Sequence, residues 1–243
     1  MAKSKSGSKS PRESWDALQQ QIVDCKKCPR LIKHCKSIAK TKRRAYADHD
    51  YWGRPVANFG KHKVPLLIVG LAPGAHGANR TGRMFTGDRS GDWLYRAMYK
   101  ADFANQAESI SLDDRLRLRR CTVTGICHCA PPDNKPTPEE VRNCEPFLEA
   151  TIQQCEPRVF LALGRLAWTG IVRFAIRNEW LSSPQPKFGH GEVVELKLPS
   201  PRARPRWLVG CFHPSQQNTF TGRLTEPMID DVFRKVNRLI DRK

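Results

Sequence analysis

Acidic side chains are scarce in this chain, and long apolar runs are absent. Its 243 residues include 24 Asp and Glu against 42 Lys and Arg, a formal net charge of +18 at pH 7. No apolar run approaches the roughly 20 residues that a membrane-spanning helix needs. The basic, Ser-rich start of the chain has no apolar core of a secretory signal. We therefore expect a protein that is neither exported nor embedded in a membrane.

The two common nucleotide-binding signatures are also missing. A hydrophobic strand at 64–69 runs into a turn rich in Gly and Pro, but the turn contains neither GxxxxGK[ST] nor GxGxxG. This absence argues against a kinase or a dehydrogenase. A nucleotide hydrolase or transferase that uses the Gly-rich turn in another way remains an alternative.

The charge that is present favours a polyanionic partner. A surface this basic attracts nucleic acid through phosphate neutralisation and release of counterions. The simpler alternative is a chain that is merely soluble and basic. We expect the first 13 residues (MAKSKSGSKSPRE) to form a disordered basic arm and residues 14–243 to form one domain.

Strands and helices alternate along the rest of the chain. Four buried strands are predicted at 64–69, 121–126, 159–163 and 207–212, with an edge strand at 191–198, and helices at 14–25, 90–100, 137–153, 165–178 and 226–241. This alternation predicts an α/β protein: a three-layer α/β/α sandwich around a short, mostly parallel four-stranded sheet.

Nine cysteines without an export signal indicate metal ligands rather than disulfides. Cys25 and Cys28 are separated by two residues, and Cys129 and Cys144 offer a second, wider pair. Four thiolates suit zinc or an iron–sulfur cluster, and the wide second pair favours the cluster. Cys127 lies on the same face of its strand as Cys129, so the spacing leaves either as the ligand. Four unrelated free thiols are the remaining alternative.

Two loops at strand ends carry the polar groups of a possible active site. One follows the strand at 64–69 and contains Phe85 and Asp88; the other follows the strand at 207–212 and begins with His213. Ends of parallel strands meet at one edge of a sheet, so the loops should converge. His213 could stabilise the anion of a departing base, Phe85 could stack on a base flipped out of the duplex, and Asp88 could orient water or stabilise a sugar cation.

Each of these residues also has a purely structural interpretation. Phe85 could belong to the core, and Asp88 could serve only as the N-cap of the following helix. Arg80 and Arg83 could hold phosphates. Neither loop contains a lysine, which a lyase forming a Schiff base would need.

Taken together, the motifs resemble the uracil-DNA glycosylase superfamily, and within it the iron–sulfur branch. The resemblance rests on the following segments, which stand in the family's order: CKKCPRL at 25–31, GLAPGAHG at 70–77, NRTGR at 79–83, FTGD at 85–88, CAPP at 129–132, NKPTP at 134–138, Cys144 and HPSQQNTFTGRLT at 213–225. The type a branch (family 4) has Glu where Leu71 stands and an Asn near Gly125. The chain resembles the type b branch (family 5) instead, which lacks the polar catalytic residue of the first motif.

This resemblance implies a monofunctional DNA glycosylase that removes uracil and other deaminated bases, including hypoxanthine, and leaves an abasic site. It implies a 4Fe–4S cluster on Cys25, Cys28, Cys129 and Cys144, and a monomeric, cytoplasmic, nucleoid-associated protein of bacteria or archaea with DNA as partner. The residues that it implies for the site are catalytic Asp88, His213, Asn134 and Asn218, base-binding Ala72 and Phe85, and DNA-binding Arg80, Arg83 and Arg223.

Broad base specificity is also expected from the chemistry. Ala72 cannot polarise water, and Gly125 cannot give paired amide hydrogen bonds to a pyrimidine, so fewer buried groups would be left unpaired by a wrong base. Phe220 and Leu224 are candidates for the residue that fills the gap left by the flipped nucleotide. The competing class is a non-catalytic nucleic-acid-binding protein that contains a cluster or zinc.

Overall fold

The computed structural model describes residues 11–200 and 204–242. Its centre is a sheet of order β1-β3-β2-β4-β6-β5. The four inner strands, β3 (Cys121–Gly125), β2 (Leu66–Gly70), β4 (Val159–Leu163) and β6 (Arg206–Cys211), are parallel. They correspond to the four predicted strands, and their directions confirm the mostly parallel sheet.

The predicted count of four strands is wrong because each edge carries an antiparallel strand. β5 (Val193–Leu196) lies inside the expected edge strand and pairs with β6. β1 (Phe59–Gly60) pairs with β3 and is only two residues long, too short to leave an alternating pattern in the sequence. The sheet therefore has six strands, with the parallel ones shielded from both edges.

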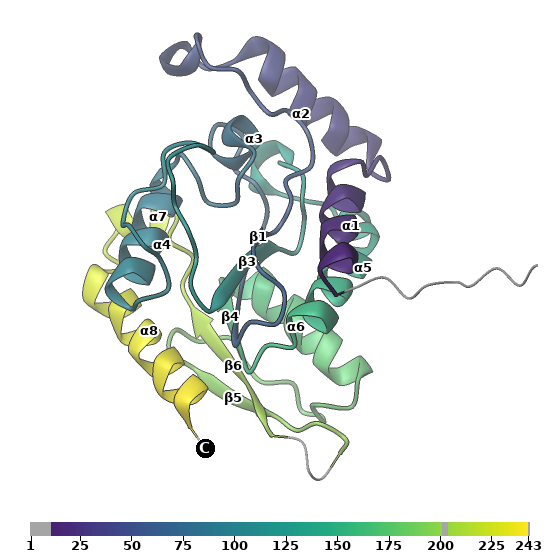
Figure 1. The fold of residues 1–243 in the computed structure, drawn as a ribbon, viewed down its shortest axis with the longest axis vertical. Helices are drawn as coiled ribbons and strands as arrows, with labels where there is room; N and C mark the ends of the chain where they lie inside the picture. Colours follow the sequence, from purple (N-terminus) through teal and green to yellow (C-terminus); the bar gives the residue numbers. More distant parts are fainter. Residues whose placement is uncertain (1–10, 201–203, 243) are drawn as a thin grey trace, which may run out of the picture.

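Helices cover both faces of the sheet, as Figure 1 shows. One layer contains α4 (Arg89–Lys100) and α8 (Glu226–Asp241); the other contains α1 (Pro11–Val23), α5 (Pro138–Cys155) and α6 (Arg165–Arg177). Successive side chains of a strand point to opposite faces of the sheet, so each strand contributes to two hydrophobic cores. In β2, Leu66 and Ile68 belong to the core under α4 and α8, whereas Leu67 and Val69 belong to the core under α1, α5 and α6. The three-layer α/β/α arrangement is confirmed.

The remaining α-helices lie towards the upper end of the molecule in Figure 1. These are α2 (Pro29–Thr41), α3 (Ala78–Thr81) and α7 (Gln216–Phe220), together with two single 3-10 turns, Arg44–Tyr46 and Pro132–Asn134. The parallel strands point their carboxyl ends towards this end. Among the described residues, no helix is both long and apolar enough to cross a bilayer.

A local signal in the sequence marks the start of α5. The helix begins with a capping box: Thr137 Oγ1 accepts the Glu140 N–H at 3.2 Å, and Glu140 Oε2 accepts the Thr137 N–H at 2.7 Å. At the start of the chain the prediction was wrong for three residues, because α1 begins at Pro11 and not at Ser14. Pro11 suits the first turn of a helix, where no backbone N–H is needed. The rest of the expected basic arm, residues 1–10, lies outside the described residues.

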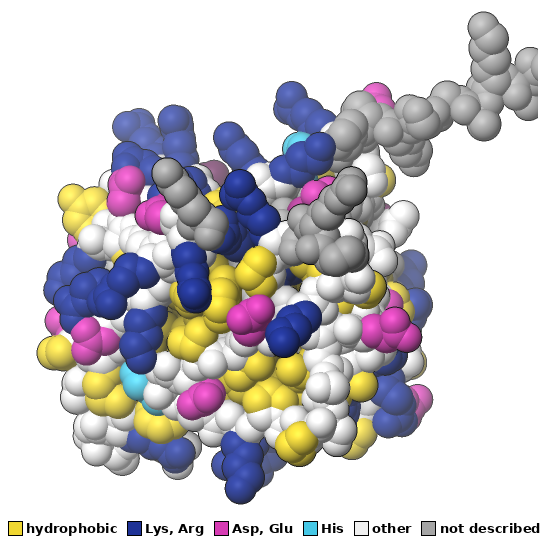
Figure 2. Space-filling model, turned by 90° about the horizontal axis from the view of Figure 1, so that it is seen from below, with side chains coloured by type: hydrophobic (Ala, Val, Ile, Leu, Met, Phe, Trp, Pro, Cys, Tyr) yellow, Lys and Arg dark blue, Asp and Glu magenta, His cyan; other side chains and the backbone are white. Residues whose placement is uncertain are grey.

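Positive charge is not confined to the end of the molecule that carries α3 and α7. Figure 2 shows the lower end of the molecule, away from α3 and α7, where Lys and Arg side chains stand among Asp, Glu and apolar ones. Net charge therefore does not locate a nucleic-acid site by itself.

Candidate active site

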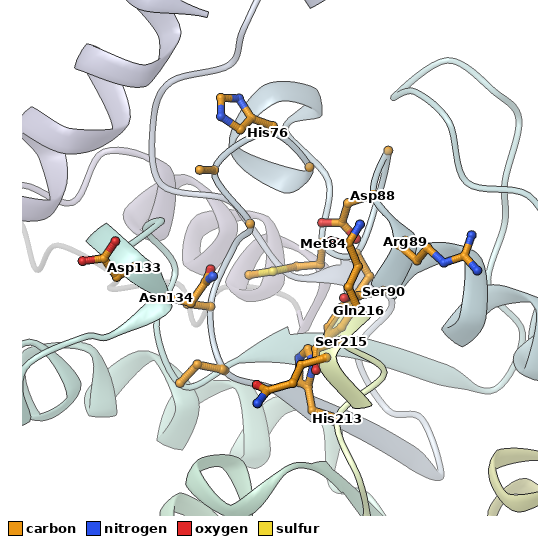
Figure 3. Close-up of a pocket in the computed structure, with 18 of the residues that line it drawn as sticks. His76, Met84, Asp88, Arg89, Ser90, Asp133, Asn134, His213, Ser215 and Gln216 are labelled. Atoms are coloured by element: carbon orange, nitrogen blue, oxygen red, sulfur yellow. The ribbon is translucent and has the colours of Figure 1, made fainter. Parts of the chain in front are cut away.

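A cavity of about 680 Å³ opens at the carboxyl edge of the sheet. Its walls come from the loop after β2, the first residues of α4, the Pro132–Asn134 turn and the loop after β6. Five predicted site residues line it: Ala72, Phe85, Asp88, Asn134 and His213. Figure 3 shows Asp88, Asn134 and His213 arranged around the same space. The expected convergence of the two loops is confirmed.

Phe85 holds an unusual backbone conformation at the wall of this cavity. Its φ is +54°, in the left-handed region that non-glycine residues rarely adopt. The ring lies over the end of β2, where a Cβ on Gly70 would come within 2.7 Å of two ring carbons. Glycine at position 70 therefore makes room for the aromatic ring.

Asp88 combines a structural position with a place at the cavity wall. It is the N-cap of α4, because its Oδ1 accepts the Gly91 N–H at 3.0 Å, and it also lines the cavity. Its Oδ2 lies against Gly77, where any Cβ would collide with the carboxylate. Burial raises the pKa of Asp88, and the hydrogen bond from Gly91 opposes that rise. A carboxylate with a raised pKa is a better proton acceptor than an exposed one.

His213 follows β6 and reaches into the cavity from the opposite wall. Burial lowers its pKa to about 4, so the imidazole is neutral near pH 7. A neutral imidazole donates one hydrogen bond and can stabilise an anion without first binding a proton. Gly164, at φ +94° after β4, lies beside it, and a Cβ there would be 3.4 Å from the Cβ of His213.

Asn218 lies in α7, outside the cavity wall. Its Nδ2 donates to the backbone O of His213 at 2.8 Å. The structure therefore gives this predicted catalytic residue a different place, bracing the loop that presents His213. Asn134, by contrast, is exposed at the rim with φ +55°, a conformation that Asn tolerates.

Arg80 and Arg83, which the sequence suggests as phosphate contacts, are both buried. Arg83 is 4% exposed and forms a bidentate pair with Asp114, at 2.6 and 2.8 Å. Arg80 is 6% exposed and donates to the backbone O of His76 and of Gly87, each at 2.8 Å. Both guanidinium groups are satisfied inside the protein, where they hold the Gly-rich loop in shape.

Arg223 remains available at the surface. It is exposed, and its guanidinium lies 4.8 Å from the ring centroid of Phe212. Of the two apolar candidates beside it, Leu224 is fully buried and Phe220 is 69% exposed. Only Phe220 is placed to contact a partner.

Sequence reasoning missed part of the cavity wall. Arg43 and Tyr46 line it from the irregular stretch between α2 and β1, and His76 lines it with Nδ1 hydrogen-bonded to the Tyr51 hydroxyl at 3.0 Å. His76 stands within a quoted motif and could have been found from it. No sequence signal marks Arg43 or Tyr46, because tertiary packing alone brings their segment to the cavity.

Four cysteines surround a separate hollow between α2 and α5. Cys25, Cys28, Cys129 and Cys144 all line it, together with Lys27 and Asn143. The Asn143 amide donates to Cys28 Sγ at 3.7 Å. Arg30 forms a bidentate pair with Glu140, at 2.8 and 2.7 Å, and so ties the helix after Cys28 to the helix that carries Cys144.

The Cys127 thiol contacts that of Cys144, but the residue is packed differently from the four cysteines of the hollow. It is 1% exposed and packs in the core under α1, α5 and α6, and it does not line the hollow. Within residues 11–200 and 204–242, no group of three or more His, Cys, Asp or Glu side chains is close enough to hold a single metal ion. The four thiols of Cys25, Cys28, Cys129 and Cys144 line one hollow.

Comparison with known proteins agrees with this site. The profile of the Uracil DNA glycosylase superfamily matches residues 57–237. A "Type-5 uracil-DNA glycosylase" of Mycobacterium tuberculosis is 50% identical over 224 residues, 91% of this chain and 80% of the relative. The "Type-5 uracil-DNA glycosylase" of Pyrobaculum aerophilum is 40% identical over 225 residues, which is 93% of each chain. The "Type-4 uracil-DNA glycosylase" of the same organism is 32% identical over 180 residues, 72% of this chain and 79% of the relative.

The chain belongs to the uracil-DNA glycosylase superfamily. Within it, the chain groups with the type-5 proteins, because these match at higher identity and over more of its length than the type-4 protein of the same organism. The resemblance read from the motifs is confirmed.

Proposed function

We propose that this protein is a DNA repair enzyme that hydrolyses the N-glycosidic bond of uracil in DNA and leaves an abasic site. The observation that carries this function is the shared cavity of His213 and Asp88, two residues from distant loops of a superfamily member. A cavity that holds one flipped base between a hydrogen-bond donor and a carboxylate is suited to this bond cleavage.

The chemistry follows from the two side chains. As the bond to the base breaks, negative charge develops on the base and positive charge on the sugar. The neutral His213 donates a hydrogen bond to the departing base. Asp88 faces the sugar side, where it stabilises the cation or orients the water that attacks it, and its raised pKa suits acceptance of a proton from that water. Phe85 provides a face on which the base can stack.

Removal of other deaminated bases, hypoxanthine among them, is part of the same proposal. Ala72 and Phe85 are apolar, and Asn134 is an exposed amide at the rim. Base-binding residues that offer few fixed polar partners discriminate weakly between bases, because a wrong base leaves few buried groups unpaired. We expect the protein to act as a monomer in the cytoplasm.

We also propose a 4Fe–4S cluster on Cys25, Cys28, Cys129 and Cys144. Thiolates of such a cluster each bind a different iron, so they surround a space, whereas the four ligands of a zinc ion converge on one atom. The hollow supports the first arrangement, and the Asn143 N–H directed at Cys28 Sγ supports a thiolate there. The cluster would tie the segment of Cys25 and Cys28 to the segments of Cys129 and Cys144. We expect that role to be structural, because the proposed hydrolysis includes no redox step.

One experiment separates this enzyme from a non-catalytic nucleic-acid binder and from a nucleotide hydrolase or transferase. Purified protein is incubated with a uracil duplex, a hypoxanthine duplex and an undamaged duplex. Abasic sites only in the damaged duplexes support the glycosylase, whereas binding without product supports the binder. Activity that requires ATP or magnesium supports the third class.

Two substitutions test the assigned roles within the same assay. His213→Ala should slow base release more than tenfold, since loss of one donor to a developing anion costs about 2.7–4 kcal/mol. Asp88→Asn keeps an N-cap for α4 and removes the charge, so a slower rate in a stable variant isolates the catalytic role. An unchanged rate in either variant would remove that residue from the mechanism.

A further inference from the structure

His190 forms two hydrogen bonds beside the end of β6, the strand that leads to His213. Its Nδ1 accepts the backbone N–H of Phe212 at 3.2 Å, and its Nε2 lies 3.3 Å from the backbone O of Met228 in α8. One neutral tautomer, with the proton on Nε2, satisfies both contacts. Burial lowers the pKa of His190, which favours that neutral form.

The bond to Phe212 replaces a missing strand partner. β6 ends at Cys211, and its last pair with β5 is Val193 with Val209, so the N–H of Phe212 lies beyond the ladder. A partly buried N–H without an acceptor would be costly. His190 supplies the acceptor one residue before His213.

Three neighbouring residues at the end of β6 are thereby held from three directions. The backbone O of Cys211 accepts the Gly164 N–H at 2.8 Å, Phe212 donates to His190, and the backbone O of His213 accepts from Asn218 at 2.8 Å. Each bond comes from a different segment of the chain. Together they fix the backbone from which the His213 ring projects.

The segment that carries His190 has little freedom to move. The N–H of Gly191 donates to the backbone O of Gly210 at 2.7 Å, and Lys235 Nζ donates to the backbone O of Gly191 at 3.0 Å. The backbone O of Gly189 packs so closely on Gly210 that a Cβ there would collide with it. The His190 ring also lies 5.0 Å from the ring of Phe212, between centroids.

We propose that His190 is a positioning residue for base excision: through the backbone N–H of Phe212 it sets the direction in which His213 meets the departing base. This role rests on the proposed function of His213. His190 does not line the cavity, so it acts on the reaction only through this backbone. A small misdirection of His213 would lower the rate, because catalysis depends steeply on the placement of reacting groups.

The test compares His190→Leu with His190→Asn. Leucine is of similar bulk and offers no acceptor, whereas the side-chain oxygen of asparagine occupies the position of Nδ1 along the chain. We expect His190→Leu to slow single-turnover release of uracil by about tenfold, and His190→Asn to recover most of that rate. Binding to a duplex with a tetrahydrofuran abasic analogue should stay within about twofold for both.

A spectroscopic readout accompanies the kinetics. The amide resonance of Phe212 should move in His190→Leu and return towards its original position in His190→Asn. Equal rates for wild type and both variants, or equally slow variants with no recovery in asparagine, would overturn the proposal. If the wild type releases no uracil, the proposed function fails, whereas the amide resonances still decide whether His190 controls this backbone.

Discussion

The ring of Phe85 lies beside the imidazole of His213, with their centroids 5.8 Å apart and their planes inclined by 32°. Two loops from distant parts of the chain therefore meet through a ring contact at the wall of the cavity. Because the Phe85 ring rests on Gly70 and the backbone of His213 is held by Asn218, each loop limits where the other can lie. The stacking face and the hydrogen-bond donor for the base are thus fixed together.

The protonation of His213 gives a prediction in the acid range. Its pKa is about 4 in the folded protein and near 6.5 in the unfolded chain. Between these two pH values the unfolded state binds more protons than the folded state. The contribution of the neutral His213 ring to the free energy of unfolding is therefore fully present above pH 6.5 and is lost as pH falls towards 4. An NMR titration should show the ring titrating near pH 4. Between pH 7 and pH 5, the free energy of unfolding of His213→Gln should fall less than that of the wild type. A ring that titrates near 6.5 would contradict the burial argument.

The Arg83–Asp114 pair predicts a stability effect without a direct effect on DNA binding. Burial alone would raise the pKa of Asp114, but the hydrogen bonds from Arg83 and from the backbone N–H groups of Leu116 and Ile110 together outweigh it and hold that pKa at about 2. Arg83→Ala leaves the Asp114 carboxylate without its partner, so we expect a loss of about 3–5 kcal/mol in the free energy of unfolding. Denaturant titration measures it.

The exposed Arg223 is the matched control for Arg83. Arg223→Ala should leave stability within about 0.5 kcal/mol and should reduce the salt dependence of duplex binding by about one phosphate contact. If Arg83→Ala changed the salt dependence and left stability intact, its assignment as a structural residue would be wrong.

The difference in exposure between Phe220 and Leu224 predicts two separate effects. Phe220→Ala should slow uracil release from duplex DNA by about tenfold, because nothing then fills the gap in the base stack, and should change release from single strands little. Leu224→Ala should instead lower the free energy of unfolding by about 2–5 kcal/mol. Equal effects of Phe220→Ala on both substrates would exclude the wedge role.

The cysteine hollow predicts different outcomes for substitution of Cys25, which lines it, and of Cys127, which does not. Cys25→Ser should abolish brown colour and visible absorption and should lower stability, because it removes a proposed ligand. Cys127→Ser should keep the colour, since Cys127 packs in the core and not at the hollow. Iron, sulfide and zinc contents measure the outcome. A colourless wild type that contains zinc would overturn the cluster.

The sequence predicted those parts of the fold that depend on local patterns. The four inner strands are short, apolar and bounded by turns, and Thr137 and Glu140 mark the start of α5 directly. β1 was not predicted because a strand of two residues is too short to show alternation of polar and apolar side chains. It forms where β3 offers a free edge for pairing. The motifs found Phe85, Asp88 and His213, because special loops at strand ends leave a strong pattern.

The sequence could not show which of several candidate site residues are buried and which are exposed. Arg80 and Arg83 follow a Gly-rich turn, where a phosphate contact was reasonable, and only the packing of Asp114 and Tyr46 around them shows that they are internal. Phe220 and Leu224 are both apolar and differ only in their surroundings. His190 stood in a segment without regular pattern, so nothing in the sequence linked it to the end of β6.

The dual placement of Asp88 bears on how this scaffold could acquire new substrates. A carboxylate that also begins a helix cannot be moved or exchanged freely without loosening α4, so we expect selection for other damaged bases to leave it alone. Ala72 carries no such second duty. Libraries that randomise this position on an unchanged Asp88 and His213 offer the shortest route to redirected repair activity.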